Sequence, residues 1–272
     1  MACSIVPAMT THELGVLGCG PMGGAIVHGA ITSGALQRCD VLAVDRDADA
    51  RSAMAALGCV VSDDIRDLES CPRLLLAVRP QDFADIGAAL QVDKDRLAIS
   101  VMAGLTSEGI AAVMGAATRV VRTMPNTAAS IGKAVTAVAA GPGATQDDLD
   151  WASTLMASVG STVIVDEAQM HAVTAVSGSG PAWVYLLAEA VQAQGAALGL
   201  SDDQLKLLVP SMVSGAAALL EADGRDPAAL REAVTTPGGT TEAGLAAMRE
   251  AGFIEAVHAG VRAACARGEA LS

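Results

Sequence analysis

The segment Gly18-Cys19-Gly20-Pro21-Met22-Gly23 has the glycine spacing of a loop that can hold a pyrophosphate group. It directly follows the apolar run Glu13 to Leu17 and opens a predicted helix. The glycines allow a tight turn and a close approach of the backbone, and the start of a helix offers free amide groups to an anion. Glycine-rich turns also occur in purely structural loops, so the position between a strand and a helix is what favours dinucleotide binding.

Two neighbouring residues of opposite charge, Asp45 and Arg46, follow the second predicted strand, Val41 to Val44. Asp45 lies 22 residues beyond Gly23, near the place where an acid meets the adenosine ribose in such a site. An aspartate favours a free 2′-hydroxyl, as in NAD, whereas Arg46 could pair with the 2′-phosphate of NADP. The sequence therefore leaves the choice between the two cofactors open.

Four other loops carry small or polar residues. AVRPQ, 77–81, and RTMPNT, 122–127, lie at the carboxyl ends of predicted strands, where ligands of open α/β sheets bind, although strand termination alone would also explain them. VSGSGPAWVY, 176–185, invites comparison with a nucleophilic serine site, but no histidine and acid lie at a recognisable spacing, so we reject that function. VTTPGGTT, 234–241, is uncharged and rich in hydroxyl groups between two predicted helices.

Short apolar runs alternate with alanine-rich amphipathic segments in the first half of the chain, which is the pattern of βα units around a parallel sheet. The predicted fold class is α/β, with a Rossmann-type, doubly wound, mostly parallel sheet. Helices are expected to begin near Pro21, Asp47, Gln81, Thr106 and Thr145. We predict strands over residues 13–17, 41–44, 74–78, 97–101, 119–123, 134–139 and 162–165.

Beyond about residue 166 the predicted strands stop and only helical segments follow. We therefore predict a dinucleotide-binding domain over residues 1–166 and an all-helical, substrate-binding and dimerisation domain over 167–272. Pro210 lies inside one of these helices and should kink or break it. His258 falls on an apolar stripe from Ile254 to Cys265 and is expected to pack in a core. Several helices are apolar on more than one face, so we expect this half to form a dimer.

The composition argues against several classes of partner and site. Thirty acidic and seventeen basic residues give the 272-residue chain a formal charge of −13, without a basic run, so nucleic acid and anionic membranes are not expected as partners. No window approaches the roughly 18 to 20 consecutive apolar residues of a membrane span. The N-terminal segment lacks the features of a secretory signal, so we expect a cytoplasmic protein. The six cysteines have no metal-binding spacing, so we expect reduced thiols and no metal site.

These motifs together resemble the pyrroline-5-carboxylate reductase family, whose members catalyse the last step of proline biosynthesis. The resemblance rests on the glycine loop, AVRPQ, SVMAG at 100–104, RTMPNT, AVSGSGPAW at 175–183 and LREAVTTPGGTT at 230–241, in this order along nearly the whole chain. SGSGPA and TTPGGTT are specific to that family, whereas the glycine loop is not. The resemblance implies a Rossmann-type N-terminal domain and a helical C-terminal domain that interleaves with its partner in a homodimer, with a ring of dimers in many members.

The resemblance also implies roles for individual residues. The implied substrate is 1-pyrroline-5-carboxylate, which is reduced to L-proline, and the implied cofactor is NADPH, with NADH as an alternative because of Asp45. The residues implied to bind the cofactor are Leu17, Gly18, Cys19, Gly20, Pro21, Met22, Asp45, Arg46, Ala77, Val78, Arg79, Pro80, Val101, Met102 and Ala103. Those implied to bind the substrate are Glu167, Ser179, Gly238, Gly239, Thr240 and Thr241.

The uncharged loop suits the reduction of a cyclic imine that carries one carboxylate. A protonated imine can arrive from solution, so no strong acid is required, and we expect the hydroxyl of Thr241, as the catalytic residue, to hydrogen-bond the ring nitrogen. The alternative is that Thr241 only caps the helix that follows. Gly238 and Gly239 would let backbone amides converge on the carboxylate at the start of that helix, without any cationic side chain.

Two rival functions are left open. A hydride-transfer enzyme of the β-hydroxyacid dehydrogenase type shares the glycine loop, but it needs a general base, commonly a lysine, and none of Lys94, Lys133 and Lys206 lies in a convincing place. A nucleotide-sensing regulatory protein would keep the glycine loop without needing SGSGPA and TTPGGTT.

The chain departs from the family pattern at Pro21, where the family often has asparagine. Proline has no amide hydrogen, so this residue removes a donor at the expected phosphate.

Overall fold

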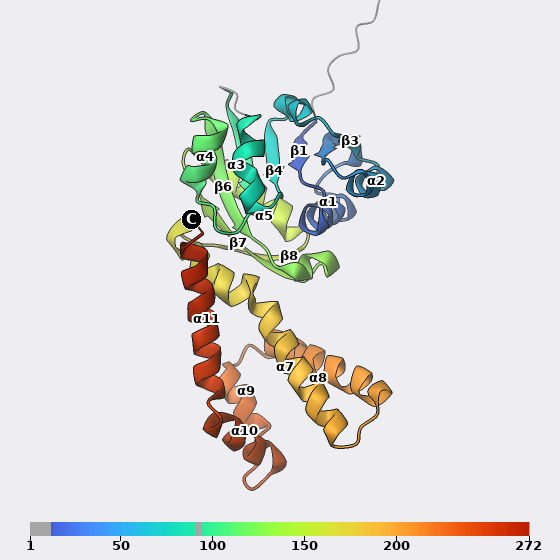
Figure 1. Ribbon diagram of the computed structural model, residues 1–272, viewed down its shortest axis with the longest axis vertical. Helices are drawn as coiled ribbons and strands as arrows, with labels where there is room; N and C mark the ends of the chain where they lie inside the picture. The colour runs from blue at the N-terminus through green and yellow to red at the C-terminus, as the bar shows by residue number, and fades with distance from the viewer. Residues whose placement is uncertain (1–11, 91–93, 272) are drawn as a thin grey trace, which may run out of the picture. The chain divides into compact units, whose positions relative to one another are not determined.

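The computed structural model describes residues 12–90 and 94–271, which form two compact units (Figure 1). One unit comprises the described residues up to 178 together with residues 265–271, and the other comprises residues 179–264. The first unit confirms the predicted mostly parallel α/β sheet, and the second confirms the predicted helical C-terminal half. Residues 167–178, which the sequence groups with the helical domain, belong by their contacts to the first unit. The division of roles at residue 166 stays a prediction.

Eight strands form one sheet in the order β3-β2-β1-β4-β5-β6-β7-β8. Neighbouring strands are parallel, except that β6 and β7 are antiparallel. The chain order reverses between β1 and β4, and ligands of doubly wound sheets bind at such a switch point. The strands are β1 (Leu14–Leu17), β2 (Val41–Val44), β3 (Val60–Ser62), β4 (Arg73–Leu76), β5 (Arg96–Ser100), β6 (Thr118–Met124), β7 (Ala134–Ala140) and β8 (Gly160–Ile164).

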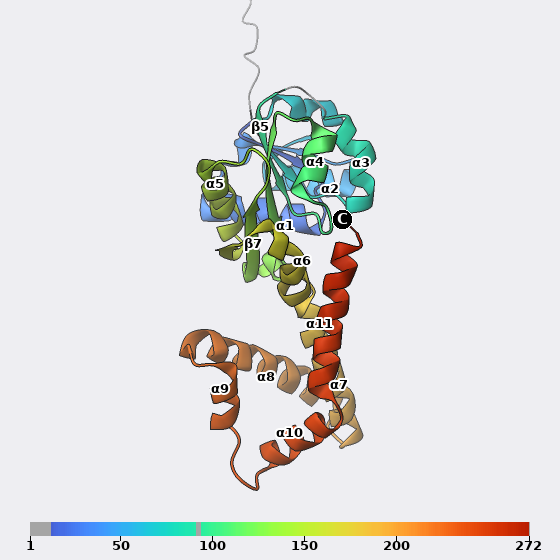
Figure 2. The ribbon, with the colours of Figure 1, turned by 90° about the vertical axis from the view of Figure 1, so that its left-hand side faces the viewer.

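Helices cover both faces of the sheet, and every residue of β1, β2 and β5 is buried between them. Figure 2 shows α1 and α5 on one face and α3 and α4 on the other. Ile26 of α1 and Met156 of α5 belong to one buried apolar cluster, and Phe83 of α3 and Ile110 of α4 belong to another. The helices of this unit are α1 (Pro21–Ser33), α2 (Ala48–Ala56), α3 (Pro80–Ala88), α4 (Ser107–Met114), α5 (Gln146–Ala157) and α6 (Met170–Val173).

Short polar residues set where these helices begin. The side chain of Asp47 accepts a hydrogen bond from the amide of Asp49 at the start of α2. Thr145 and Asp148 form a capping box at the start of α5. Four 3₁₀ turns connect elements of the unit: η1 (Arg38–Asp40), η2 (Ile65–Ser70), η3 (Thr127–Ile131) and η4 (Glu167–Gln169). A π-helical turn, η5 (Thr174–Gly178), follows α6 and ends the first unit's continuous segment.

The second unit is helical and has few side chains inside it. Among residues 179–264, all of which the structure describes, the buried apolar side chains are Leu205 and Val209 of α8, which pack toward α7. A capping box between Ser201 and Gln204 opens α8. The helices are α7 (Gly180–Ala197), α8 (Asp202–Asp223), α9 (Pro227–Ala233), α10 (Thr240–Glu250) and α11 (Phe253–Glu269), whose last residues belong to the first unit.

Three sequence-based expectations differ from the structure. The strand β3 was not predicted, because Val60–Ser62 is too short to show a pattern and is defined by its pairing with β2. The helix α8 runs unbroken through Pro210, so the proline does not break it, and a kink at Pro210 stays a prediction. The expectation of a core position for His258 is wrong for the single chain, in which this residue is exposed.

Candidate functional site

The loop between β1 and α1 packs its glycines tightly. Gly18 has a φ of +97°, and its amide donates to the carbonyl oxygen of Val44 at 2.9 Å. A Cβ atom on Gly18 would lie 2.7 Å from the backbone of Ala77, and one on Gly23 would lie 2.2 Å from the carbonyl oxygen of Gly18. A Cβ atom on Gly20, in contrast, would meet no atom within 4 Å. The fold therefore requires glycine at positions 18 and 23, whereas position 20 faces open space.

The first turn of α1 presents backbone amides at this open space. Gly20 is the N-cap residue of the helix, and its cap has no side-chain hydrogen bond. The first amides of a helix lack intrahelical acceptors and carry a partial positive charge, which favours an anion. Pro21 has no amide hydrogen, so the donors of this turn are Met22 and Gly23. The loop and the helix start therefore fit a pyrophosphate group.

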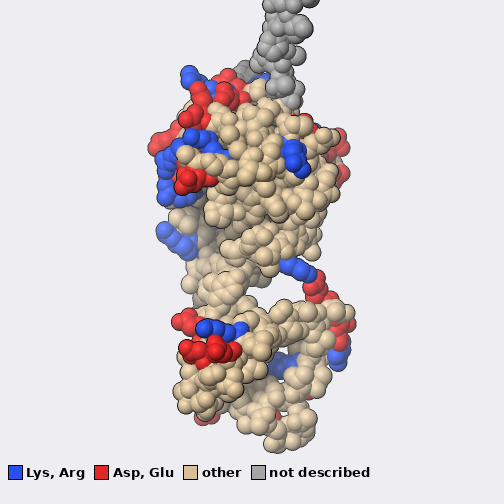
Figure 3. Space-filling view, turned by 90° about the vertical axis from the view of Figure 1, so that its right-hand side faces the viewer, with Lys and Arg blue, Asp and Glu red and all other residues tan. Residues whose placement is uncertain are grey.

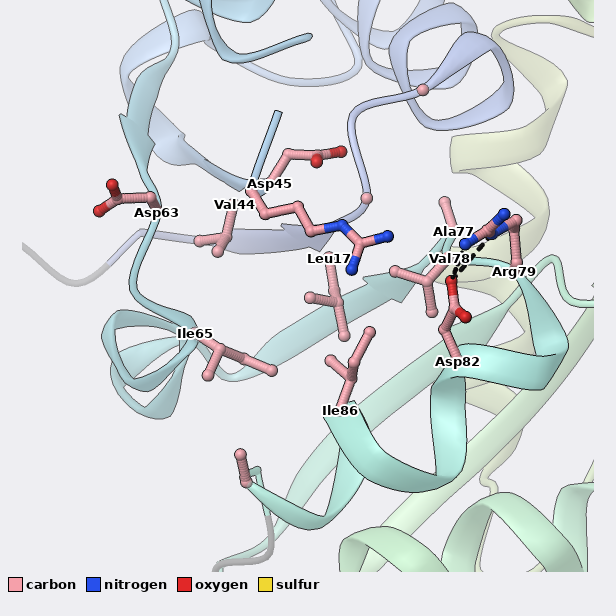
Figure 4. A pocket seen from close by; sticks show the side chains of 14 residues that line it. Leu17, Val44, Asp45, Asp63, Ile65, Ala77, Val78, Arg79, Asp82 and Ile86 are labelled. Carbon is pink, nitrogen blue, oxygen red and sulfur yellow. Dashed lines mark hydrogen bonds and ion pairs between the residues drawn. The ribbon is translucent and has the colours of Figure 1, made fainter. Parts of the chain in front are cut away.

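A pocket of about 390 Å³ lies at the carboxyl ends of β1, β2 and β4, where the strand order reverses (Figure 4). The structure brings together there three groups of predicted cofactor residues: Leu17, Gly18 and Gly20 from the glycine loop, Asp45 and Arg46 after β2, and residues 77–79 after β4. A pocket at the switch point of a doubly wound sheet, with a glycine loop in its wall, is the expected place for a dinucleotide.

Six lining residues of this pocket were not predicted from the sequence: Asp63, Ile65, Asp82 and Ile86, together with Val44 at the end of β2 and Ala89 after α3. The first two follow the short strand β3, which the sequence did not indicate. Asp82 and Ile86 lie one helical turn apart on α3, and this spacing was a usable signal. Figure 4 shows Ile65 and Ile86 on one side of the pocket, and the carboxylate of Asp82 is paired there with the guanidinium of Arg79 at 2.8 Å.

The carboxylate of Asp45 is bonded to the backbone at both oxygens. Oδ2 accepts a hydrogen bond from the amide of Cys19 at 2.7 Å, and Oδ1 accepts one from the amide of Asp47 at 2.9 Å. Burial, reinforced by the charge of Asp45, raises the pKa of the Cys19 thiol to about 12, so this sulfur is a neutral packing group. The guanidinium of Arg51 donates to the carbonyl oxygens of Asp45 and Arg46 at 2.8 and 2.9 Å and holds the turn after β2.

The other predicted cofactor residues do not line this pocket. Val101 follows β5, the neighbour of β4, and its amide donates to the carbonyl oxygen of Leu76 at 3.1 Å. The segment 101–103 therefore lies at the same edge of the sheet, on its β5 side. The predicted residues outside the pocket lining are Cys19, Pro21, Met22, Pro80, Val101, Met102 and Ala103.

Glu167, a predicted substrate residue, is bonded within the first unit. Its Oε1 accepts hydrogen bonds from the amide of Ser107 at 2.8 Å and from the guanidinium of Arg122 at 3.0 Å, and the hydroxyl of Ser107 donates to Oε2. Burial alone would raise the pKa of Glu167, but the bonds from Ser107 and the charge of Arg122 outweigh it and lower the pKa. The carboxylate caps the start of α4 and neutralises an Arg122 side chain that is only 7% exposed.

Ser107 and Arg122 were not predicted from the sequence as partners of Glu167. The usable signal was Arg122 itself, because an arginine inside a buried strand requires an acidic partner. These three side chains border a hollow of about 450 Å³ together with His171.

Residues 234–239 link α9 to α10 in the second unit, and residues 240 and 241 are the first two of α10. Gly238 has a φ of +71°, and its amide donates to Oε2 of Glu242 at 2.7 Å. A hollow of about 650 Å³ beside the loop is bordered by Gly238, Gly239 and Glu242 and also by two arginines, Arg231 and Arg249. This hollow therefore contains cationic and acidic side chains beside the backbone amides, and the anion site without a cationic side chain stays a prediction.

The N-cap residue of α10 is Gly239, and its cap has no side-chain hydrogen bond. Thr240 and Thr241 occupy the first two positions of the helix, so the alternative in which Thr241 caps the helix is wrong. The first-turn amides of α10 lack intrahelical acceptors, as at the start of α1. The helix start thus presents backbone donors and two threonine hydroxyls in one turn.

The remaining candidates lie elsewhere. Ser179 is the residue before α7, at the junction of the π-helical turn with that helix. The carbonyl oxygen of Ser177 in that turn accepts a hydrogen bond from the side-chain amide of Asn126 at 3.3 Å, so the RTMPNT loop contacts the SGSGPA segment. None of the three lysines lines the dinucleotide pocket; Lys94 donates to the carbonyl oxygen of Glu69, and the other two are exposed. The geometry gives no support to a lysine base.

Two family models match the chain. Residues 167–271 match a model described as pyrroline-5-carboxylate reductase dimerisation. Residues 13–104 match a model described as NADP oxidoreductase, coenzyme F420-dependent. The first match spans the helical segments, and the second spans the strands and the glycine loop that form the dinucleotide pocket.

Curated relatives match over nearly the whole chain. A pyrroline-5-carboxylate reductase 2 from Bacillus subtilis is 35% identical over 251 residues and covers 90% of each chain. A pyrroline-5-carboxylate reductase from Mycobacterium tuberculosis is 36% identical over 285 residues, covering 95% of this chain and 96% of its own. A solved pyrroline-5-carboxylate reductase from Coxiella burnetii has a TM-score of 0.88 at 30% identity, covering 96% of this chain and 99% of that chain.

Proposed function

The chain belongs to the pyrroline-5-carboxylate reductase family, and on this premise we propose how its sites carry the reaction. It is an NAD(P)H-dependent oxidoreductase that transfers a hydride to the C=N carbon of 1-pyrroline-5-carboxylate and gives L-proline, the last step of proline biosynthesis. The observation that carries this function is the similarity to such reductases over 90% to 95% of the chain. The glycine-loop pocket at the switch point of the sheet supports it.

In this proposal the first unit holds the cofactor. Residues 17–22 and the first amides of α1 bind the pyrophosphate, and the turn at Asp45 and Arg46 lies at the adenosine ribose. Residues 77–80 and 101–103, after β4 and β5, line the nicotinamide side. When bound, the cofactor supplies the hydride. The protein's part is to hold the cofactor and the substrate in register, which is where most of the rate acceleration is expected to arise.

The substrate is assigned to the loop that opens α10. The amides of Thr240 and Thr241, in the first turn of that helix, donate hydrogen bonds to the carboxylate of the imine, and the hydroxyl of Thr241 hydrogen-bonds the proton-bearing ring nitrogen. Gly238 and Gly239 allow the backbone of the loop to turn into the helix, although the amide of Gly238 already donates a hydrogen bond to Glu242. Roles for Glu167 and Ser179 at the substrate stay predictions.

The helical half contains the family's dimerisation domain, and we assign it to a homodimer, with a ring of such dimers as the larger assembly. Figure 3 supports a large contact, because the surface it shows over the helical unit is mostly uncharged. The helix α8 is long and apolar enough, by length and composition alone, to cross a membrane. We assign its apolar surface to the partner subunit and the protein to the cytoplasm, with neither a membrane nor nucleic acid as a partner.

The test is the steady-state oxidation of NADPH and of NADH, measured separately with purified protein and 1-pyrroline-5-carboxylate. Turnover with either cofactor is the expected result, and the ratio of the two kcat/KM values gives the preference. Binding of the cofactor without turnover of the imine would overturn the proposal and favour a nucleotide-sensing role.

A further inference from the structure

Asp45 is the acid that a dinucleotide site of this type would use to bind the adenosine ribose, yet both of its carboxylate oxygens accept hydrogen bonds from the protein backbone. One oxygen accepts a hydrogen bond from the amide of Cys19, inside the glycine loop, at 2.7 Å. The other accepts a hydrogen bond from the amide of Asp47 at 2.9 Å. Figure 4 shows the carboxylate pointing away from Ile65 and Ile86, the apolar side of the pocket. The shorter of the two bonds joins the end of β2 to the loop after β1.

The turn that carries Asp45 is also fixed from its other side. The guanidinium of Arg51 donates to the carbonyl oxygens of residues 45 and 46, so the backbone of the turn is held in place, and the carboxylate is held by its own two hydrogen bonds. The amide of Asp45 itself donates to the carbonyl oxygen of Ser62 on β3 at 3.3 Å. The side chain of Arg46 is exposed and lines the pocket. The charged group offered to a ligand by this turn is thus the guanidinium of Arg46.

We infer that Asp45 is a positioning residue, which holds the glycine loop through the amide of Cys19, and that it does not select between a free and a phosphorylated ribose. This inference rests on the proposed function only in that a dinucleotide occupies the pocket. A carboxylate bonded to an amide forms one of the stronger hydrogen bonds in proteins, and it orients the loop whose backbone faces the pyrophosphate. Because NADH and NADPH share the pyrophosphate, loosening the loop weakens the binding of both.

Binding of the ribose by Asp45 and positioning of the loop by Asp45 predict different results in a binding experiment. A ribose ligand would favour the free 2′-hydroxyl of NADH and repel the 2′-phosphate of NADPH, so its removal would shift the ratio of the two affinities toward NADPH. A loop-positioning residue changes the two affinities by the same factor and leaves their ratio where it was. The ratio therefore separates the roles without any measurement of turnover.

The experiment compares the dissociation constants of NADPH and NADH, by titration calorimetry, for the unaltered protein and for Asp45→Ala, Asp45→Asn and Asp47→Ala. We expect Asp45→Ala to weaken both cofactors by about tenfold, with their ratio changed by less than about twofold. Asp45→Asn keeps one oxygen acceptor and the shape of the side chain, so a smaller loss is expected. Selective loss of NADH, with stronger binding of NADPH, in either Asp45 variant would overturn the inference.

The matched control is Asp47→Ala, which removes an acid two residues away and uncaps α2 without touching the glycine loop. It should lower the melting temperature and leave both dissociation constants within about twofold of the unaltered protein. Equal losses of affinity in Asp47→Ala and Asp45→Ala would mean that only the stability of α2 matters, and would also overturn the inference.

Hydrogen exchange at the Cys19 amide, followed by NMR, decides the matter independently of any ligand. We expect faster exchange of this amide in Asp45→Ala than in the unaltered protein and in Asp47→Ala. Unchanged exchange would remove the basis of the inference. A protein that binds neither cofactor would refute the proposed function instead, and the exchange rates would still show whether Asp45 holds the loop.

Discussion

At the scale of single residues, Thr241 has the most direct assigned role in the reaction. It occupies the second position of α10, behind an N-cap glycine, so its hydroxyl is not needed to cap the helix. Replacement of Thr241 by alanine would remove the proposed hydrogen bond to the ring nitrogen and should lower kcat/KM by about 3- to 10-fold, with little loss of stability. Steady-state kinetics with saturating NADPH measure this, and Thr241→Ser, which keeps the hydroxyl, should recover most of the activity. Unchanged kcat and KM in Thr241→Ala would remove the residue from the mechanism.

The lowered pKa of Glu167 should make the stability of the protein depend on pH. Its pKa is lowered in the folded protein, so the unfolded chain binds the proton more readily. The stabilisation from its ionised form is complete above the ordinary glutamate pKa of about 4.3, and it is lost as the pH falls through the lower folded pKa. We expect the free energy of unfolding of the unaltered protein to decrease with acid in this range.

The variant Glu167→Gln should show a flatter acid dependence, because the titrating group is gone. At neutral pH it leaves the guanidinium of Arg122 buried without its charged partner, which costs about 1 to 3 kcal/mol. Urea unfolding between pH 3 and pH 7 measures both effects. The control is Glu108→Gln, an exposed acid one residue beyond Ser107, which should follow the unaltered protein. Parallel curves for Glu167→Gln and the unaltered protein would show that this carboxylate does not stabilise the fold.

At the scale of elements, the loop between β1 and α1 separates glycines that the fold requires from one that faces open space. A Cβ atom at position 23 would clash with the carbonyl oxygen of Gly18, so Gly23→Ala must displace the loop and should both lower the melting temperature and abolish cofactor binding. A Cβ atom at position 20 meets no atom, and its φ of −66° suits alanine. Gly20→Ala should therefore fold normally and weaken only cofactor affinity, as measured by calorimetry and thermal unfolding. Equal melting temperatures for the two variants would contradict this distinction.

The elements also show what the sequence can and cannot reveal. The long apolar strands and the capping residues carry their signal locally, so β1, β2 and the start of α5 were predictable. The strand β3 depends on pairing with β2, which no local pattern records. The pairing of Glu167 with Ser107 spans 60 residues, and the bond from Cys19 to Asp45 spans 26. Eight of the predicted cofactor residues line the pocket, whereas the residues after β3 and on α3 and the bonding partners of Asp45 and Glu167 depended on the tertiary fold.

At the scale of the whole molecule, the helical unit has too small an interior to be stable alone. Residues 179–264 bury two apolar side chains, whereas Leu186, Leu207, Leu219 and other large apolar residues of α7 and α8 are more than one third exposed. Exposed apolar surface of this extent marks a protein interface. The apolar stripe that includes His258 has the same explanation. This histidine was predicted to be buried, and it is exposed in the single chain but would be covered by a partner subunit.

The interface can be tested with one charge on α8. The side chain of Leu207 is 69% exposed, so Leu207→Glu leaves no cavity in the single chain but would bury a carboxylate in a dimer interface. We expect dimer dissociation to become at least about tenfold easier, seen by sedimentation at micromolar concentration, with the sheet unit still folded. Val60→Glu on the edge strand β3, 43% exposed, is the matched control and should keep the assembly of the unaltered protein. If Leu207→Glu also keeps it, α8 does not face a partner at that position. Dissociation should also lower activity, because a helical unit with so little buried surface of its own cannot hold the loop before α10 in a fixed conformation.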